Sequence, residues 1–233
     1  MKHIVEISKQ ALTQMLLNGF EAFVIKHGDK KRSGIEFHAS LYGDIKILDK
    51  GKKYRHVIEF ISVDTSAEMN SGSVSFSIEA SDLKEDIAEQ MGFYQLGKMH
   101  SHPYLAHEMS VDEVRKQGFD FSPGDLEAIS DAIDRYEEGL GYHLEVLLTI
   151  TEMKQKNTSL DGRKESNLFE FSVGNCKCFL HAQVFSKSDD KLHWDDTELR
   201  CSFLEQNGHL EANFGLIKAK KGRKRVLEYK PNN

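Results

Sequence analysis

The feature that most constrains the fold of this chain is a pair of histidines, His100 and His102, with an aspartate, Asp125, further along. The histidines follow a segment typical of a strand, and side chains at positions i and i+2 of a strand project to the same side. Asp125 lies three residues after Ser122, in the first turn of an expected helix, and positions i and i+3 share a helix face. A strand end and a helix start can therefore bring three side chains to one point.

Such a point has the chemistry of a metal centre. Two imidazoles and one carboxylate suit a divalent transition metal. Three protein ligands leave a fourth position for water, which is the pattern of a catalytic zinc site rather than a structural one. An activated water also needs a group that takes its proton, and the sequence around the two histidines and the aspartate supplies none. A carboxylate from elsewhere in the chain is therefore expected.

The bulk composition is that of a globular protein. The chain has 233 residues, of which 39% are hydrophobic and 29% charged, enough apolar mass for a core. No apolar run reaches the length that crosses a bilayer, and the first residues do not resemble a signal peptide. Three cysteines do not make a disulfide framework, so we expect a cytoplasmic protein in which Cys176, Cys178 and Cys201 are small buried residues.

The charge is unevenly distributed. The net charge is −6, yet residues 218–230 contain seven lysines and arginines and one glutamate. The rest of the chain is therefore strongly acidic, which argues against broad binding to nucleic acid. The basic segment leaves open a local acidic partner or nucleic acid, although a solvated terminus is the simpler interpretation.

Apolar periodicity predicts a domain that mixes helices and strands. Helices are expected over residues 8–23 and 81–91 and from Ser122 onward, with Ser8 and Ser122 as N-caps. Strands are expected over residues 4–7, 34–42, 54–63, 73–78, 94–99, 142–151, 169–173 and 178–185, with a turn at residues 43–44 and a helix or two strands within 197–217. Residues 26–33, 104–121 and 153–166 have the polar composition of loops. The expected class is α+β, a mixed β-sheet flanked by helices.

Two of these segments carry a family resemblance. His100-Ser101-His102-Pro103 and Ser122-Pro123-Gly124-Asp125 resemble the two halves, H-x-H-P and S-x-x-D, of the JAMM motif of MPN/JAB-domain zinc metalloproteases. The segment Gly34-Ile35-Glu36-Phe37-His38-Ala39-Ser40-Leu41-Tyr42-Gly43 resembles the early strand that carries the glutamate of that family. The chain looks most like a prokaryotic-type JAB domain, and the resemblance covers roughly residues 4–151.

The resemblance implies a role for each matched residue. His100, His102 and Asp125 would ligate one zinc ion per chain. Glu36 would act as general base and pass the proton to the leaving amine. Ser122 would donate a hydrogen bond to the oxyanion of the tetrahedral intermediate. The implied fold is the MPN/JAB type, and the implied reaction is hydrolysis of an amide or isopeptide bond.

One departure from the family motif is the spacing of its halves. Residues 103–124 separate His102 from Asp125, whereas the family usually has a shorter spacer. The additional residues fall within 104–121, which we interpret as an insertion beside the active site that could shape substrate choice or act as a lid. We therefore expect a catalytic domain over residues 1–151, a C-terminal β-rich elaboration of it over 152–217 and a basic tail over 218–233.

Several other residues have alternative interpretations. Glu59, on a neighbouring expected strand, is the second candidate for the general base. His38 could support the metal ligands from behind, although a solvent-exposed or core histidine is the simpler interpretation. His107 and Glu108, in the insertion, could contribute to a second metal site or an inhibitory ligand, although a solvated loop is simpler.

The sequence therefore favours a JAMM-type zinc metalloprotease. Its partner would be a protein or peptide substrate, with a ubiquitin-like protein among the candidates, and neither a membrane nor nucleic acid is expected. The alternative is an MPN-type domain that binds protein partners without catalysis; such domains typically lack the ligands, which this chain keeps. A DNA-linked role, as in RadC-type relatives, is a third hypothesis that rests on the basic tail alone.

Overall fold

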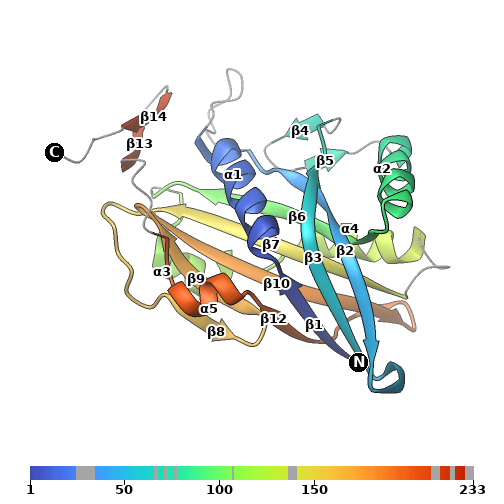
Figure 1. The fold of residues 1–233 in the computed structure, drawn as a ribbon. Helices are drawn as coiled ribbons and strands as arrows, with labels where there is room; N and C mark the ends of the chain where they lie inside the picture. Colours follow the sequence, from blue (N-terminus) through green and yellow to red (C-terminus); the bar gives the residue numbers. More distant parts are fainter. Residues whose placement is uncertain are drawn as a thin grey trace.

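A computed structural model describes residues 1–24, 35–65, 68–70, 73–75, 78–106, 108–135, 141–210, 216–220 and 224–228. Strands dominate this part of the chain (Figure 1). The strands are β1 (Lys2–Ile7), β2 (His38–Leu48), β3 (Lys53–Val63), β4 (Glu68–Asn70), β5 (Ser73–Ser75), β6 (Tyr94–Tyr104), β7 (Tyr142–Glu152), β8 (Gly162–Glu165), β9 (Leu168–Val173), β10 (Cys176–Ser188), β11 (Lys191–Trp194), β12 (Asp196–Arg200), β13 (Leu216–Lys220) and β14 (Lys224–Glu228). The helices are α1 (Lys9–Val24), α2 (Ile78–Gln90), α3 (Val111–Glu113), α4 (Pro123–Arg135) and α5 (Ser202–Asn207), with a 3₁₀ turn over Asp49–Gly51 and a π-helical turn over Val114–Gly118.

The main sheet has ten strands and mixes parallel with antiparallel pairs. Its order is β12-β1-β3-β2-β6-β7-β10-β9-β8, and β11 pairs with β10. Strand β6 runs antiparallel to β2 and parallel to β7, so the strand with the two histidines is flanked on both sides. The expected mixed sheet flanked by helices is confirmed, whereas its MPN/JAB type stays a prediction.

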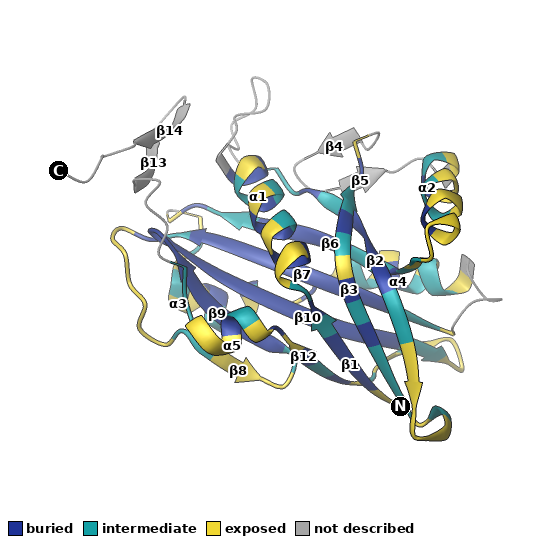
Figure 2. Ribbon diagram, viewed as in Figure 1, coloured by how far each residue is buried: buried dark blue, intermediate teal, exposed yellow. Residues whose placement is uncertain are grey.

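Helices cover both faces of the sheet, and the alternation of β7 shows why. Leu148 packs in the large core beneath α1, while the preceding residue, Leu147, packs with Ile129 of α4 on the opposite face. Gly19 lets α1 approach closely, since a β-carbon there would come within 2.8 Å of Leu148. The middle of the sheet is accordingly buried, as Figure 2 shows for β7 and β10.

Helices α1 and α4 begin where the sequence predicts them, directly after Ser8 and Ser122. The hydroxyl of Ser8 accepts a hydrogen bond from the backbone N–H of Ala11 at 3.0 Å, as an N-cap does. No helix within the described ranges is both long and apolar enough to cross a membrane. The C-terminal strands β8 to β12 continue the main sheet rather than forming a sheet of their own.

The structure corrects the boundaries of the early strands. Strand β2 begins at His38 rather than at residue 34, and it continues through Gly43 and Asp44, where we expected a turn. The glycine instead marks a bulge, because the register with β3 shifts there and a β-carbon at Gly43 would come within 1.8 Å of the carbonyl oxygen of Val57. Strand β6 likewise passes through the histidines to Tyr104 instead of ending before them.

Other expectations need smaller corrections. Of the strand expected over 73–78, Ser73–Ser75 form β5, residues 76 and 77 lie outside the described residues, and Ile78 belongs to α2. The loops expected over 104–121 and 153–166 contain helical turns and strand β8, respectively. Part of the basic tail forms a hairpin of β13 with β14. The loop expected over 26–33 lies outside the described residues.

Candidate metal centre

The structure brings His100, His102 and Asp125 together. Each offers one possible ligand atom, and these atoms all lie within 4.8 Å of one another. The Nε2 atom of His100 is 3.5 Å from Oδ1 of Asp125, and the Nε2 atom of His102 is 3.4 Å from Oδ2. Both imidazoles are buried and the carboxylate is half-buried, so the cluster could hold a metal ion at the point where β6 meets the start of α4.

The first turn of α4 fixes the carboxylate. The backbone N–H of Ser122 donates to the Asp125 carboxylate at 2.7 Å, and the N–H of Asp125 donates to the Ser122 hydroxyl at 3.2 Å. This reciprocal pair is a capping box, and Pro123 suits the first helical position because that position needs no N–H donor. Capping therefore leaves the hydroxyl hydrogen of Ser122, which is exposed, available to a further acceptor.

The cluster is electrostatically coupled. Burial alone would lower the pKa of His100, but its contacts with Asp125 and Glu145 outweigh burial and raise that pKa to about 10. Burial alone would raise the pKa of Asp125, whereas the two histidines lower it well below its usual range. Even so, Nε2 of His100 and Nδ1 of His102 are buried without a hydrogen-bond partner among the described residues. A cation bound beside Asp125 would satisfy Nε2 of His100, which faces that carboxylate, so the donor set fits a metal.

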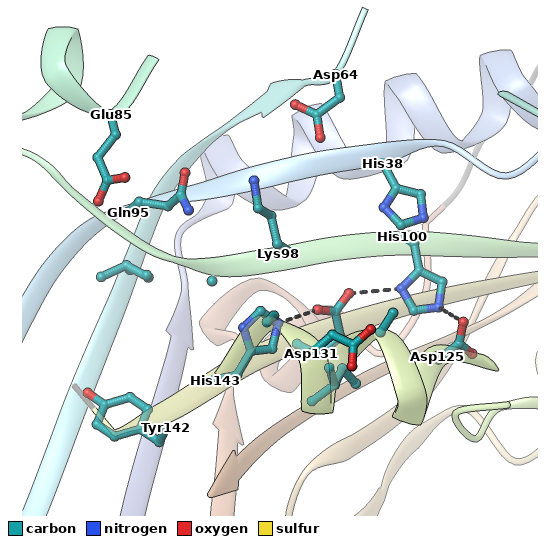
Figure 3. A pocket seen from close by; sticks show the side chains of 16 residues that line it. His38, Asp64, Glu85, Gln95, Lys98, His100, Asp125, Asp131, Tyr142 and His143 are labelled. Carbon is teal, nitrogen blue, oxygen red and sulfur yellow. Dashed lines mark hydrogen bonds and ion pairs between the residues drawn. The ribbon is translucent and has the colours of Figure 1, made fainter. Parts of the chain in front are cut away.

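Glu145, on β7, was not predicted from the sequence. Its carboxylate contacts Nδ1 of His100 at 2.8 Å with one oxygen and Nε2 of His143 at 2.8 Å with the other (Figure 3). A carboxylate behind a histidine fixes its tautomer and leaves the opposite nitrogen for a metal. The only sequence signal is the spacing of His143 and Glu145, which share one face of β7.

Glu36 lies beside the candidate ligands. The backbone pairing of β2 with β6 sets His38 opposite His100, and it continues through a hydrogen bond from the N–H of Ser101 to the carbonyl of Phe37 at 3.1 Å. The next pair after Phe37 and Ser101 in this register is Glu36 and His102, so the two side chains are expected on the same face of the sheet. Burial raises the pKa of Tyr104, and Glu36 and Asp125 raise it further, so both carboxylates act on the same phenol.

The second candidate for the base is not brought to the site. Glu59 is exposed on β3, which β2 separates from β6. Glu59 follows Ile58, which pairs with Gly43 of β2. Gly43 pairs with Tyr94, which lies at the opposite end of β6 from the two histidines. Of the two glutamates, Glu36 is the one that the pairing of β2 with β6 brings toward the candidate ligands, and its role as general base stays a prediction.

His38 has a position that the simpler interpretation did not anticipate. Its ring stacks on that of His100 with centroids 5.2 Å apart. Burial, with a smaller contribution from His100, lowers the pKa of His38 to about 4. His38 is therefore a neutral imidazole packed against the candidate ligand, which is the supporting position considered for it.

The insertion over residues 104–121 packs on the C-terminal strands. Val114 packs with Leu168 of β9 and Phe179 of β10. Arg115 donates to both carboxylate oxygens of Glu170, at 2.6 and 3.1 Å. Glu108 is exposed and accepts a hydrogen bond from a backbone N–H within its own turn at 2.9 Å, as expected of a loop residue, and His107 lies outside the described residues. This anchoring does not suit a freely moving lid.

The three cysteines are free and buried in the main core, which confirms their interpretation as small buried residues.

A cavity of about 360 Å³ adjoins the metal candidate. It extends from His100 and Asp125 along β6 toward Gln95, between α2 and α4 (Figure 3).

Comparison with known proteins adds no family. No protein-family model matches the chain, and no curated protein matches it. Among solved structures, the solution structure of protein DSY2949 from Desulfitobacterium hafniense is similar over 89% of this chain and 99% of its own length, with 14% sequence identity and a TM-score of 0.38. A likeness this weak says nothing about the activity of this chain.

Proposed function

We propose that this protein is a zinc-dependent hydrolase of the JAMM type, which cleaves an amide or isopeptide bond in a peptide or protein, with ubiquitin-like proteins among the candidate substrates. The observation that carries the proposal is the convergence of His100, His102 and Asp125, whose candidate ligand atoms lie within 4.8 Å of one another. A structural zinc site would fill its fourth position with another protein ligand, and no fourth ligand belongs to the group found among the described residues.

The donor set supports zinc in particular. Two imidazoles with one carboxylate is a ligand set used by catalytic zinc. Zinc in this position would polarise the scissile carbonyl and lower the pKa of a water molecule in its open position to about 7. Glu145 supports the same assignment, because it orients His100 so that Nε2 faces Asp125.

The remaining steps fall to side chains of the chain itself. Glu36, opposite His102, would take a proton from the attacking water and deliver it to the leaving amine. The Ser122 hydroxyl, which already accepts the N–H of Asp125, would donate its hydrogen to the oxyanion. The negative charges of Glu36 and Asp125 both raise the pKa of Tyr104, so we place this phenol in the same reaction space.

The first test is the metal content of the purified protein. Elemental analysis is expected to find about one zinc per chain in the wild type, and a large loss in His100→Ala and Asp125→Asn. The matched control is His193→Ala, which removes an exposed histidine from β11 and should keep the zinc. A wild type without bound metal, in which His100→Ala behaves like His193→Ala, would exclude the metal centre.

The second test separates catalysis from metal binding. Glu36→Gln is expected to retain zinc and to lower the rate of amide hydrolysis by about 10² to 10⁴-fold, the usual contribution of a general base. Glu59→Gln, on β3, is the control and should leave the rate unchanged. Captured substrate in the Glu36→Gln variant, followed by mass spectrometry of a lysate, would then identify the peptide or protein that is cleaved. Full activity in Glu36→Gln would assign the base to another group.

A further inference from the structure

The cavity beside the metal candidate has an apolar lining along much of its length. Leu96 of β6 and the ring of Tyr142 of β7 line it from the sheet. Ala128, Ile129 and Ala132, on one face of α4, line it from the other side. A lining of this kind suits the methylene groups of a side chain and excludes a fully hydrated ion.

The charges around this lining are predominantly negative. Five carboxylates line the cavity, and Lys98 is the only lysine or arginine that does so. The carboxylates are those of Asp64, Glu85, Asp125, Asp131 and Glu145. The Lys98 amine donates to the hydroxyls of Ser40 at 2.8 Å and Ser81 at 3.2 Å, so it is engaged with the protein. The cavity as a whole therefore favours a cation over an anion.

Two of the five carboxylates have no ion pair among the described residues. Asp125 and Glu145 are engaged with the site histidines, and Asp64 pairs with Lys84 at 2.8 Å. Glu85 of α2 and Asp131 of α4 have no such partner, and Figure 3 shows them on either side of the cavity. Burial raises the pKa of Glu85, and the neighbouring carboxylates of Glu89 and Asp82 add to this effect, while Lys98 opposes it.

The cavity adjoins the metal candidate, because His100 and Asp125 both line it. The Nε2 atom of His100 faces Asp125 at 3.5 Å, so it belongs to the metal candidate itself. A group held in the cavity would therefore extend from the reacting centre, with its far end near the unpaired carboxylates of Glu85 and Asp131.

We propose that this cavity binds a lysine or arginine side chain of the substrate, next to the amide that is cleaved. The apolar lining would contact the methylene groups, and Glu85 with Asp131 would attract the cationic end. The inference rests on the proposed hydrolysis for the position of the amide, but the binding of the side chain can be measured without any reaction.

Three small probes test the proposal on the zinc-loaded full chain: the N-acetyl methylamides of lysine, norleucine and glutamate. Titration followed by NMR should give an affinity for the lysine probe about 5-fold above that for norleucine, which keeps the four side-chain carbons but lacks the ammonium group, since a partly exposed ion pair contributes up to about 1 kcal/mol. The glutamate probe should bind weakest. Equal affinities, undetectable lysine binding or a preference for glutamate would overturn the proposal.

Variants then assign the preference to residues. Glu85→Gln combined with Asp131→Asn is expected to reduce the affinity for lysine to that for norleucine. Asp86→Asn combined with Glu127→Gln removes the same charges from exposed positions of the same helices, outside the cavity lining, and should change neither affinity. A lysine preference that survives the first pair of substitutions would overturn the assignment.

Hydrolysis of peptides with the same three side chains separates this inference from the proposed function. Lysine binding with no cleavage of any peptide would refute the hydrolase and leave the cavity assignment standing. Cleavage without any preference for the basic side chain, together with equal probe affinities, would refute the cavity assignment and leave the hydrolase standing.

Discussion

At the scale of single residues, the metal candidate depends on a carboxylate that is not itself a candidate ligand. Glu145 is buried and contacts both His100 and His143. With Nδ1 of His100 engaged, only Nε2 is left to face Asp125. The orientation of the ligand is thus fixed before any metal arrives, which reduces the conformational freedom lost on binding.

This arrangement gives a quantitative expectation for Glu145→Gln. The amide keeps the shape of the side chain but cannot bridge two imidazoles as a carboxylate does, so zinc affinity is expected to fall by about 10 to 100-fold. Competition with a chromogenic chelator measures the change. Glu127→Gln, on the exposed face of α4, is the control. Unchanged affinity in Glu145→Gln would mean that His100 is oriented by its packing alone.

The sequence predicted the parts of the site that lie in short motifs. His100 with His102, and Ser122 with Asp125, are related by strand and helix periodicity, and each spacing could be interpreted locally. Glu145 and the cavity carboxylates could not be predicted in the same way, because their position depends on the parallel register that sets Lys98 beside Glu145. Such a register is a property of the assembled sheet.

A second pair of buried histidines predicts how stability depends on pH. His56 is fully buried, and its Nε2 atom lies 3.1 Å from Nδ1 of His3. Burial, with a smaller contribution from His3, lowers the pKa of His56 to about 3. The unfolded chain protonates His56 near pH 6.5, so the stabilisation is present above that pH and is lost as the pH falls toward the folded value.

Urea unfolding at pH 7, 6 and 5 measures this effect. In the wild type, His56 alone is expected to cost about 2 kcal/mol of unfolding free energy between pH 7 and pH 5. His56→Phe should be less stable at pH 7, because His3 loses its partner, but its stability should decline less with acid. His193→Gln, at an exposed site, should follow the wild type. Equal acid dependence in His56→Phe and the wild type would contradict the assignment.

At the scale of elements, the insertion is held by the apolar packing of Val114 and by an ion pair with β9. Glu170 is 1% exposed and accepts hydrogen bonds from Nε and Nη2 of Arg115, while Lys177 and Lys164 lie further from it, at 3.5 and 3.6 Å. The sequence indicated a polar loop here, because its short helical turns have no clear period. The ion pair of Arg115 with Glu170, some fifty residues later in the chain, helps to fix the segment. Local sequence patterns do not reveal such a contact.

Arg115→Met tests this anchoring. The substitution leaves Glu170 buried with only the more distant lysines, so the unfolding free energy is expected to fall by about 2 to 3 kcal/mol, somewhat less than for a buried pair that is broken completely. Zinc content should not change, since the ligands belong to β6 and α4. Lys116→Met, an exposed neighbour, should stay within about 0.5 kcal/mol of the wild type. An equally small effect of Arg115→Met would mean that apolar packing alone holds the insertion.

At the scale of the whole molecule, the class of fold was predictable and the order of the strands was not. The strands predicted over residues 142–151 and 178–185 are confirmed as parts of β7 and β10. Nothing in either segment shows that β10 lies directly against β7, or that β12 lies at the far edge beside β1. Pairing partners are chosen by shape and burial across the sheet, which short windows do not contain.

The pairing of β1 with β12 has a consequence for the order in which the protein can fold. Residues 2–7 are synthesised long before residues 196–200, which form the strand that covers their outer edge. During translation, that edge stays open until almost the whole described sheet has left the ribosome, and contacts of such large sequence separation form slowly. A nascent chain stalled before residue 196 would therefore expose an unpaired strand edge, the surface that chaperones and aggregating partners recognise.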